Sequence, residues 1–216
     1  MRFNPAHAVS DPDEQAALVR ELVAGHPWAT IVSAGPDGLV ASHYPVLWEE
    51  ADDLVLLTHV GRPDEMGHGF DGGREVLVVV QGHHGYVSPS WYADGDTRAP
   101  TWNFTTAHLH GVPEVVDAAT NLAVLTRLVE HFEQHVEEPV LLDQEFGARL
   151  ARGTVGLRIP VSRIELKVKM SQDKLPDSRA EVLRQLRGTG PYAHPALADD
   201  MERALARGIG RRSDDR

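Results

Sequence analysis

The sequence predicts a mainly β fold in which helices flank an antiparallel sheet or barrel. Several apolar segments rich in β-branched residues follow one another between residues 28 and 116, separated only by short turns. Consecutive strands joined in this way are typical of antiparallel rather than parallel sheets. No GxxxxGK[ST] motif occurs, and the expected elements do not alternate between strand and helix, so a parallel nucleotide-binding sheet is not expected.

Length and composition limit the possible classes of protein. The 216 residues suffice for one hydrophobic core, and the absence of cysteine excludes a disulfide scaffold, a thiolate nucleophile and a cysteine-ligated metal. The net charge of −11 repels phosphate backbones, so direct binding of nucleic acid is not expected. No apolar run approaches the roughly 20 residues of a membrane span. We therefore expect a soluble, cytoplasmic protein without a membrane partner.

A first helix is expected over residues 12–25. Asp11 is a suitable N-cap, Pro12 suits the first helical position, and Glu14 can return a hydrogen bond to the cap. Gly25 is expected to end the helix, because glycine accepts the backbone conformation that terminates helices.

A β-hairpin is expected next, with strands over 28–34 and 39–48. The sequence Gly35-Pro36-Asp37-Gly38 between them is typical of a turn, since proline fixes φ and glycine accepts positive φ. The segment 77–80 is apolar on both faces, which predicts a central strand. Further strands are expected at 53–60, at 74–81 with a continuation or bulge over 82–89, and at 101–116 with a bend at Gly111 and Pro113.

The C-terminal half is predicted to begin with a long helix over 117–136. Its apolar stripe comprises Ala118, Leu122, Leu125, Val129, Phe132 and Val136. A shorter helix over 143–152 and a last strand over 153–170 follow, and Pro160 in that strand indicates an edge or a bulge. We expect a main domain over 1–172 and a helical extension over 173–216, with frayed, disordered last residues.

The segment 81–111 is rich in aromatic and histidine residues. Aromatic rings and polar groups at strand ends suit a flat heteroaromatic ligand, although an aromatic core beside a turn has the same composition. His108 and His110 alternate on one face of a strand, whereas His83 and His84 point to opposite faces. A histidine from this set could ligate haem iron. No carboxylate pattern completes a metal site, so none is predicted.

Two segments could bind an anion. Gly61 and Arg62 follow a strand at a turn, where backbone N–H groups and a guanidinium can bind a phosphate; an ordinary surface arginine is the alternative. Lys167, Lys169 and Ser171 share one face of the last strand, and a solvated edge strand with lysines is the alternative there.

Four strings, in their order and spacing, resemble a known family. VASHYPVLW, QGHHGYVSPSWY, APTWNFTTAHLHG and KMSQD are similar to those of the PaiB-type FMN-binding negative transcriptional regulators. The resemblance covers roughly residues 1–190. It implies a split β-barrel related to the pyridoxamine phosphate oxidases, with a homodimer that holds FMN in a cleft shared by two subunits.

The resemblance also implies which residues bind the cofactor, but no catalytic side chain, since the flavin carries any redox chemistry. Ser42, His43, Tyr44 and Pro45 would run along the isoalloxazine ring, and His59, Gly61 and Arg62 would lie near the phosphate. Trp91, Tyr92, Thr101, Trp102 and Asn103 would line the cleft, which Lys169, Ser171 and Gln172 would close.

Several functional hypotheses remain open from the sequence. The first is an FMN-binding protein with an oxidoreductase-like or regulatory role. The others are a haem-binding protein that uses His83, His84, His108 or His110, a repressor that binds DNA directly, and a cofactor-free dimer that mediates interactions.

Overall fold

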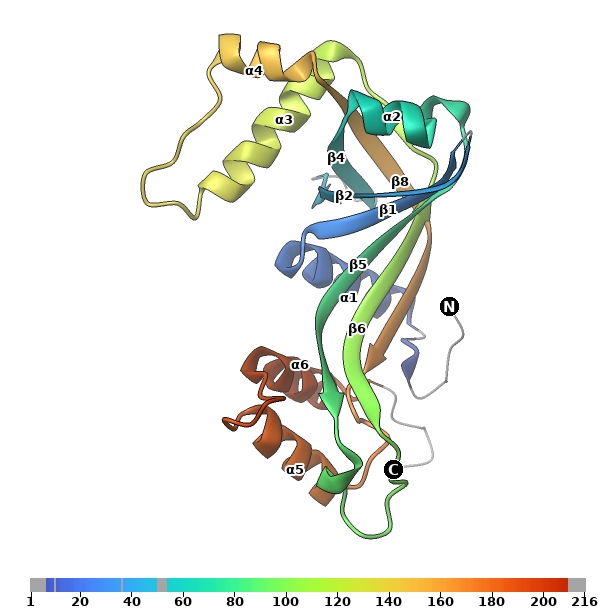
Figure 1. The fold of residues 1–216 in the computed structure, drawn as a ribbon, viewed down its shortest axis with the longest axis vertical. Helices are drawn as coiled ribbons and strands as arrows, with labels where there is room; N and C mark the ends of the chain where they lie inside the picture. Colours follow the sequence, from blue (N-terminus) through green and yellow to red (C-terminus); the bar gives the residue numbers. More distant parts are fainter. Residues whose placement is uncertain (1–6, 10, 36, 50–53, 210–216) are drawn as a thin grey trace. The chain divides into compact units, whose positions relative to one another are not determined.

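The strands of the protein form one sheet in the computed structural model, which describes residues 7–9, 11–35, 37–49 and 54–209 (Figure 1). The strands are β1 (Trp28–Gly35), β2 (Gly38–Pro45), β3 (Leu47–Trp48), β4 (Val55–Gly61), β5 (Val76–Val87), β6 (Thr101–Gly111), β7 (Glu114–Val115) and β8 (Thr154–Lys169). Their order in the eight-stranded sheet is β2-β1-β5-β6-β8-β4-β3, with β7 paired to β8. Within the described residues this order is an open path rather than a closed ring.

Helices precede, interrupt and follow the sheet. They are α1 (Pro12–Gly25), α2 (Arg62–His68), α3 (Ala118–Glu133), α4 (Gln144–Ala151), α5 (Pro176–Leu186) and α6 (Pro195–Ala206), with short 3₁₀ turns η2 (Phe70–Gly72) and η3 (Pro89–Trp91). The pairs β1–β2, β1–β5, β3–β4 and β4–β8 are all antiparallel. The predicted fold class, an antiparallel sheet with flanking helices, is therefore confirmed. No helix in the described ranges has the length and apolar character needed to cross a membrane.

The chain divides into two compact units. The first comprises residues 1–19, 81–107 and 165–216, and the second comprises 20–80 and 108–164. The strands β5, β6 and β8 contribute residues to both units.

The first helix and the first hairpin form where the local sequence signals predict them. Asp11 Oδ1 accepts hydrogen bonds from the backbone N–H groups of Asp13 and Glu14, both at 2.9 Å, so Asp11 caps α1. The helix ends at Gly25. The hairpin of β1 and β2 is in register from Trp28 opposite Pro45 to Gly35 opposite Gly38.

The second unit has its core between α3 and the strands β3 and β4. Leu47, Leu57, Val124 and Leu128 form one buried cluster. The predicted stripe of α3 is wrong at both ends, since Ala118 and Phe132 are exposed and Val136 is exposed and lies beyond the helix. The buried face includes Asn121 instead, because its side chain donates hydrogen bonds to the carbonyl oxygens of Ala151 and Thr154. A stripe defined by apolar residues alone does not detect this polar anchor.

Two further expectations fail in the second unit. The segment after Gly61 was expected to be a turn, but it forms α2, in which Pro63 occupies the first turn where proline is tolerated. Of the two alternatives that Pro160 indicates, the edge strand is wrong, because β8 lies between β6 and β4. Gly111 gives Pro160 room, because a Cβ at Gly111 would stand 2.3 Å from the carbonyl oxygen of Pro160.

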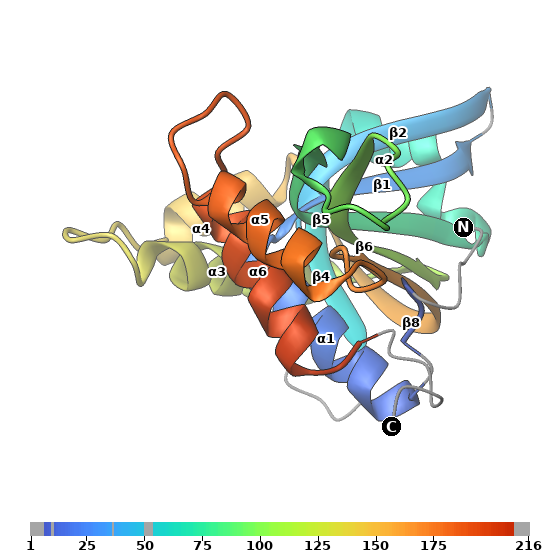
Figure 2. The same cartoon turned by 90° about the horizontal axis from the view of Figure 1, so that it is seen from below.

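The first unit has its core around the two C-terminal helices, which pack side by side (Figure 2). Val182 and Leu186 of α5 and Leu197 and Met201 of α6 are fully buried. Leu197 also packs against β5 at Gly85, where an added Cβ would lie 2.8 Å from its side chain. Asn103 Nδ2 also donates to Met201 Sδ at 3.7 Å, so α6 contacts a residue of the predicted site.

Candidate functional site

The predicted site residues fall into two groups, one in each unit. The second-unit group is Ser42, His43, Tyr44, Pro45, His59, Gly61 and Arg62, which lie on β2, β4 and the start of α2. The first-unit group is Trp91, Tyr92, Thr101, Trp102, Asn103, Lys169, Ser171 and Gln172, which lie at η3, at the start of β6 and at the end of β8.

Tyr44 connects the members of the second-unit group. Its hydroxyl accepts a hydrogen bond from the backbone N–H of Gly61 at 3.0 Å and donates one to the Asp64 carboxylate. Burial, followed by the bond to Asp64, raises the pKa of Tyr44, so its hydroxyl stays protonated. The rings of Tyr44 and His59 meet edge to face, with centroids 6.1 Å apart. β2, β4 and α2 thus bring three of the predicted residues together.

Polar groups of the Gly61–Asp64 segment bond to other groups of the protein. The N–H of Gly61 is engaged by Tyr44, and Nε of Arg62 donates to the carbonyl oxygen of Arg152 at 2.6 Å. Asp64 brings a carboxylate to the same place. An anion at this segment would meet a negative charge and an amide that already has a partner.

His59 carries an unused polar atom. Its Nδ1 is buried and has no hydrogen-bond partner among the described residues. Burial also lowers the pKa of His59, so the ring is neutral at pH 7. Buried polar atoms in folded proteins nearly always have partners, and a bound ligand could supply the missing one.

His68, which was not predicted from the sequence as a site residue, contacts Ser42. It is 1% exposed, its Nδ1 lies 2.8 Å from Ser33 Oγ, and its Nε2 lies 3.0 Å from Ser42 Oγ. The ring stacks on Phe70 with centroids 4.6 Å apart. Burial lowers the pKa of His68, so the neutral ring donates through one nitrogen and accepts through the other. This contact fixes the hydroxyl of Ser42, and no local pattern in the sequence reveals it.

In the first-unit group, Asn103 anchors an unusual turn. Asn103 is fully buried, and its Oδ1 accepts a hydrogen bond from Ser171 Oγ at 3.0 Å. Ser171 has φ 57°, the positive value that side chains other than glycine rarely adopt. The Gln172 side chain closes the turn, since it accepts from the N–H of Met170 and donates to the carbonyl of Val168, both at 2.6 Å. Such strained residues concentrate at ligand sites.

In the same unit, Lys169 has no ion-pair partner and the Tyr92 hydroxyl has no hydrogen-bond partner among the described residues. Lys169 Nζ donates to the neutral Thr101 hydroxyl, and burial lowers the pKa of Lys169. The Tyr92 hydroxyl is buried without a partner among the described residues. Burial raises the pKa of Tyr92 to about 12. Lys174 Nζ lies 5.1 Å from the Tyr92 ring centroid, so ammonium groups and a phenol are concentrated here.

Aromatic rings complete the first-unit group. Trp102 is 52% exposed, and its ring neighbours are His84 and Tyr86 at 6.2 and 6.3 Å between centroids. Tyr86 in turn contacts Tyr192 at 5.0 Å. Exposed rings of this kind supply stacking area for a flat ligand. Trp91 lies in η3, whose first turn is capped by Ser88.

The four histidines of the haem hypothesis do not belong to one unit. His83 and His84 are in the first unit, where His83 Nδ1 lies 2.9 Å from Asp200 and His84 Nδ1 lies 3.2 Å from the Gly82 carbonyl. His108 and His110 are in the second unit, where His110 Nδ1 lies 3.2 Å from Glu75. Within the described ranges, no group of three or more His, Cys, Asp or Glu side chains could hold a metal ion.

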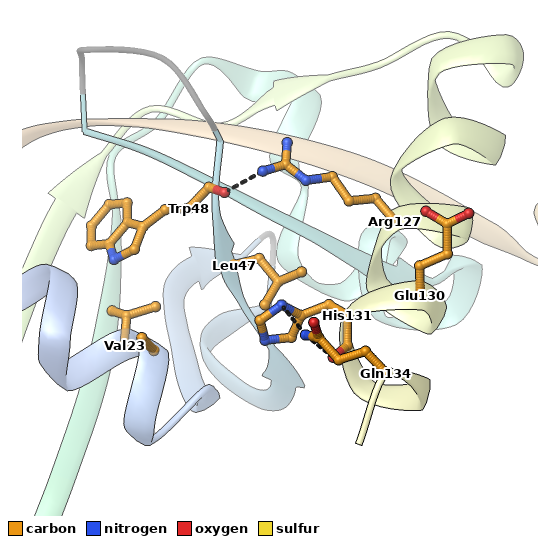
Figure 3. A pocket seen from close by; sticks show the side chains of 8 residues that line it. Val23, Leu47, Trp48, Arg127, Glu130, His131 and Gln134 are labelled. Atoms are coloured by element: carbon orange, nitrogen blue, oxygen red, sulfur yellow. Dashed lines mark hydrogen bonds between the residues drawn. The ribbon is translucent and has the colours of Figure 1, made fainter. Parts of the chain in front are cut away.

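A separate pocket of about 410 Å³ lies in the second unit between α1, β3 and α3 (Figure 3). An apolar wall faces a polar wall formed by one side of α3. Arg127 Nη2 donates to the carbonyl oxygen of Trp48 at 2.8 Å. None of the predicted cofactor residues lines this pocket, whose lining is Val23, Ala24, Leu47, Trp48, Arg127, Glu130, His131 and Gln134.

Comparison with known sequences identifies related proteins. A family model described as "Putative FMN-binding domain" matches residues 1–163. The chain is 29% identical over 198 residues to "Protease synthase and sporulation protein PAI 2" of Bacillus subtilis, a match that covers 90% of this chain and 95% of the relative. It is 31% identical over 87 residues to "Uncharacterized protein YKL070W" of Saccharomyces cerevisiae, covering 38% and 52% of the two chains.

Comparison with solved structures identifies the fold. The FAD and heme binding protein from Mycobacterium smegmatis superposes with a TM-score of 0.55 at 16% identity, covering 74% of this chain and 72% of that one. The flavocytochrome Anf3 from Azotobacter vinelandii superposes with a TM-score of 0.53 at 14% identity, covering 74% and 68%. Both likenesses concern the fold alone and agree with the fold class that the sequence predicts.

Proposed function

The chain belongs to the family of FMN-binding domains whose model matches residues 1–163, and from this premise we propose that it binds flavin mononucleotide as a resident cofactor. When bound, the flavin supplies electron or hydride transfer. The protein supplies binding and orientation, which explains why no nucleophile or general base stands out among the predicted site residues.

One observation carries this proposal. Two of the predicted cofactor residues, His59 and Tyr92, have buried polar atoms without a hydrogen-bond partner among the described residues. A structural role alone leaves such atoms unexplained, because burying a polar atom without a partner is unfavourable. The carbonyls, ring nitrogens and ribityl hydroxyls of a flavin are donors and acceptors that would satisfy them.

The remaining predicted residues have properties that suit the same ligand. The exposed ring of Trp102 would stack on a flat heteroaromatic system. Ser42, held by His68, would offer a fixed hydroxyl to a polar edge of the flavin. Asn103 and Gln172 hold the turn at Ser171 in place, so their role is to position the groups around them.

The proposal extends to assembly and role. We assign the protein a homodimer that holds FMN in a cleft shared by two subunits, as the family resemblance implies. An oxidoreductase-like role is favoured over direct binding of DNA, because the net charge of −11 opposes contact with phosphate backbones. Any regulatory effect would then be indirect and would follow from the flavin chemistry.

Titration of flavin-free protein with FMN tests this proposal. We expect one FMN bound per chain with a Kd of roughly micromolar or tighter, and sedimentation of the same sample is expected to give a dimer. His59→Leu is expected to weaken FMN binding at least fivefold, because it removes the unpaired buried nitrogen.

His135→Leu is the matched control, since His135 is an exposed histidine outside both groups, and it is expected to bind FMN like the original protein. The proposal is wrong if the unmodified chain does not take up FMN. If His59→Leu binds as tightly as His135→Leu, His59 has no place in the site.

A further inference from the structure

The lysines of this chain are concentrated in one place. Of the 21 basic Lys and Arg residues only three are lysine, and these are Lys167, Lys169 and Lys174. All three lie in the first unit, at the end of β8 and in the turn that follows. In a chain with a net charge of −11, such a local group of ammonium groups is a specific feature.

We propose that the phosphate of bound FMN is held by Lys167 and Lys169 together with His7, and not by the segment at Gly61. This inference rests on the proposed function and specifies its phosphate site. The ligand class is a phosphate monoester, which carries between one and two negative charges at pH 7.

Lys169 is the first part of the argument. It is partly buried, its Nζ donates to a neutral hydroxyl, that of Thr101, and it forms no ion pair with any described residue. A buried charge without a counterion is unfavourable. Burial lowers the pKa of Lys169; the negative charge of Asp173 offsets part of this effect, and the positive charges of Lys167 and Lys174 add to it. An anionic group beside Lys169 would stabilise its charged ammonium form.

Lys167 adds a second ammonium on the same face of β8. Residues two apart on a strand point to the same side, and Lys167 Nζ lies 5.6 Å from the centroid of the Phe104 ring. Within the described part of the chain Lys167 also has no carboxylate partner. Two adjacent ammonium groups without counterions match the charge of one phosphate monoester.

His7 supplies a buried hydrogen-bond donor at the same place. The neighbouring Ala8 forms a β-bridge with Lys167, which brings His7 to the end of β8. His7 is 5% exposed, and neither ring nitrogen has a partner among the described residues. Burial lowers the pKa of His7, so its neutral ring has one N–H to donate to a phosphate oxygen.

The carboxylates near the three lysines balance the charge of only one of them. Lys174 Nζ lies 3.6 Å from Asp173 and 3.9 Å from Asp96, so the charge of Lys174 is already balanced. Neither carboxylate is within ion-pair distance of Lys167 or Lys169. The two unbalanced ammonium groups are therefore the ones that we assign to the phosphate.

The segment that the resemblance places near the phosphate is less suitable. The N–H of Gly61 already donates to Tyr44, and Asp64 brings a negative charge to the same hydroxyl. Arg62 is held by the carbonyl of Arg152. A phosphate at this segment would have to displace the Tyr44 contact and oppose Asp64.

Comparison of three flavins tests the assignment. The unmodified protein is expected to bind FMN at least tenfold more tightly than riboflavin, which lacks the phosphate, and more tightly than FAD, which lacks a terminal monoester. Lys169→Met is expected to weaken FMN binding about tenfold and to leave riboflavin binding unchanged. Lys169→Arg, which keeps the charge, is expected to restore most of the preference for FMN. Arg184→Met, an exposed first-unit control, is expected to bind all three flavins like the original.

Amine acetylation followed by mass spectrometry gives a second readout, because only three side chains can react. FMN is expected to protect Lys167 and Lys169 from acetylation, whereas riboflavin is not. Equal affinity for FMN and riboflavin, or equal loss of both in Lys169→Met, would overturn the phosphate assignment and leave the proposed function standing. A preference for FMN that is lost in Arg62→Ala but kept in Lys169→Met would move the phosphate to the Gly61 segment. Failure to bind any of the three flavins would instead contradict the proposed function itself.

Discussion

Replacing Asn103 with leucine is expected to lower both the stability of the protein and its affinity for flavin. Leucine has a similar size but cannot accept the hydrogen bond from Ser171 Oγ, which is itself buried. Leaving a buried hydroxyl without a partner costs about 1–3 kcal/mol of unfolding free energy. The positive φ of Ser171 then loses its restraint, and we expect FMN to bind at least tenfold more weakly. Urea denaturation and FMN titration of the same variant measure the two effects.

Ser171→Gly separates these effects, because glycine adopts φ near 57° without strain. We expect Ser171→Gly to keep the unfolding free energy within about 1 kcal/mol of the original, since relief of strain offsets the lost hydrogen bond. Its FMN affinity is nevertheless expected to fall. If Asn103→Leu left both stability and affinity unchanged, the turn at Ser171 would have no role in the site.

Replacing His68 with leucine is expected to lower the unfolding free energy by about 1–3 kcal/mol, because the buried hydroxyl of Ser33 and the partly buried hydroxyl of Ser42 lose their hydrogen bonds to the ring. The pH dependence should change as well. Burial lowers the pKa of His68, so below about pH 6.5 the unfolded chain binds a proton that the folded protein does not. The stability contributed by neutral His68 is complete above that pH and is lost as the pH falls further.

Denaturation between pH 7.5 and 5 measures this change. The original protein is expected to lose stability as the pH falls, and His68→Leu should lose less. Burial also lowers the pKa values of His7 and His59, so part of the slope should remain. His135→Leu is the exposed control and should keep the original slope. An identical slope in His68→Leu would show that His68 is not neutral in the folded protein.

Local sequence signals predicted those parts of the fold that depend on neighbours in the chain. The cap at Asp11 and the end at Gly25 are set by residues within one helical turn, and α1 has these limits. The apolar segment 77–80 predicted a central strand, and β5 indeed lies between β1 and β6. Capping, turn chemistry and burial on both faces are properties that a short segment expresses by itself.

The failures concern residues whose role depends on distant partners. Asn121 faces inward because carbonyl groups more than 29 residues away accept from it. Pro160 is accommodated because Gly111 in another strand has no side chain. The helix α2 forms between Gly61 and Gly69 although it contains Pro63, since proline is tolerated in a first helical turn.

The candidate site shows the same division. The resemblance selected Tyr44 and Gly61, which contact each other, and Asn103 and Ser171, which also do. It did not select His68 or His7. His68 reaches Ser42 through the end of α2, and His7 reaches β8 through the bridge at Ala8. Only the folded chain brings these residues to the predicted ones.

The visible absorption spectrum of freshly purified protein, with mass spectrometry of the molecule that heat releases, tests the central claim most directly. The proposed function predicts the two absorption bands of an oxidised flavin and a released mass equal to that of FMN. A Soret band would contradict this account and assign the cofactor to the histidines as a haem. A colourless protein that also fails to take up added FMN would contradict flavin binding altogether.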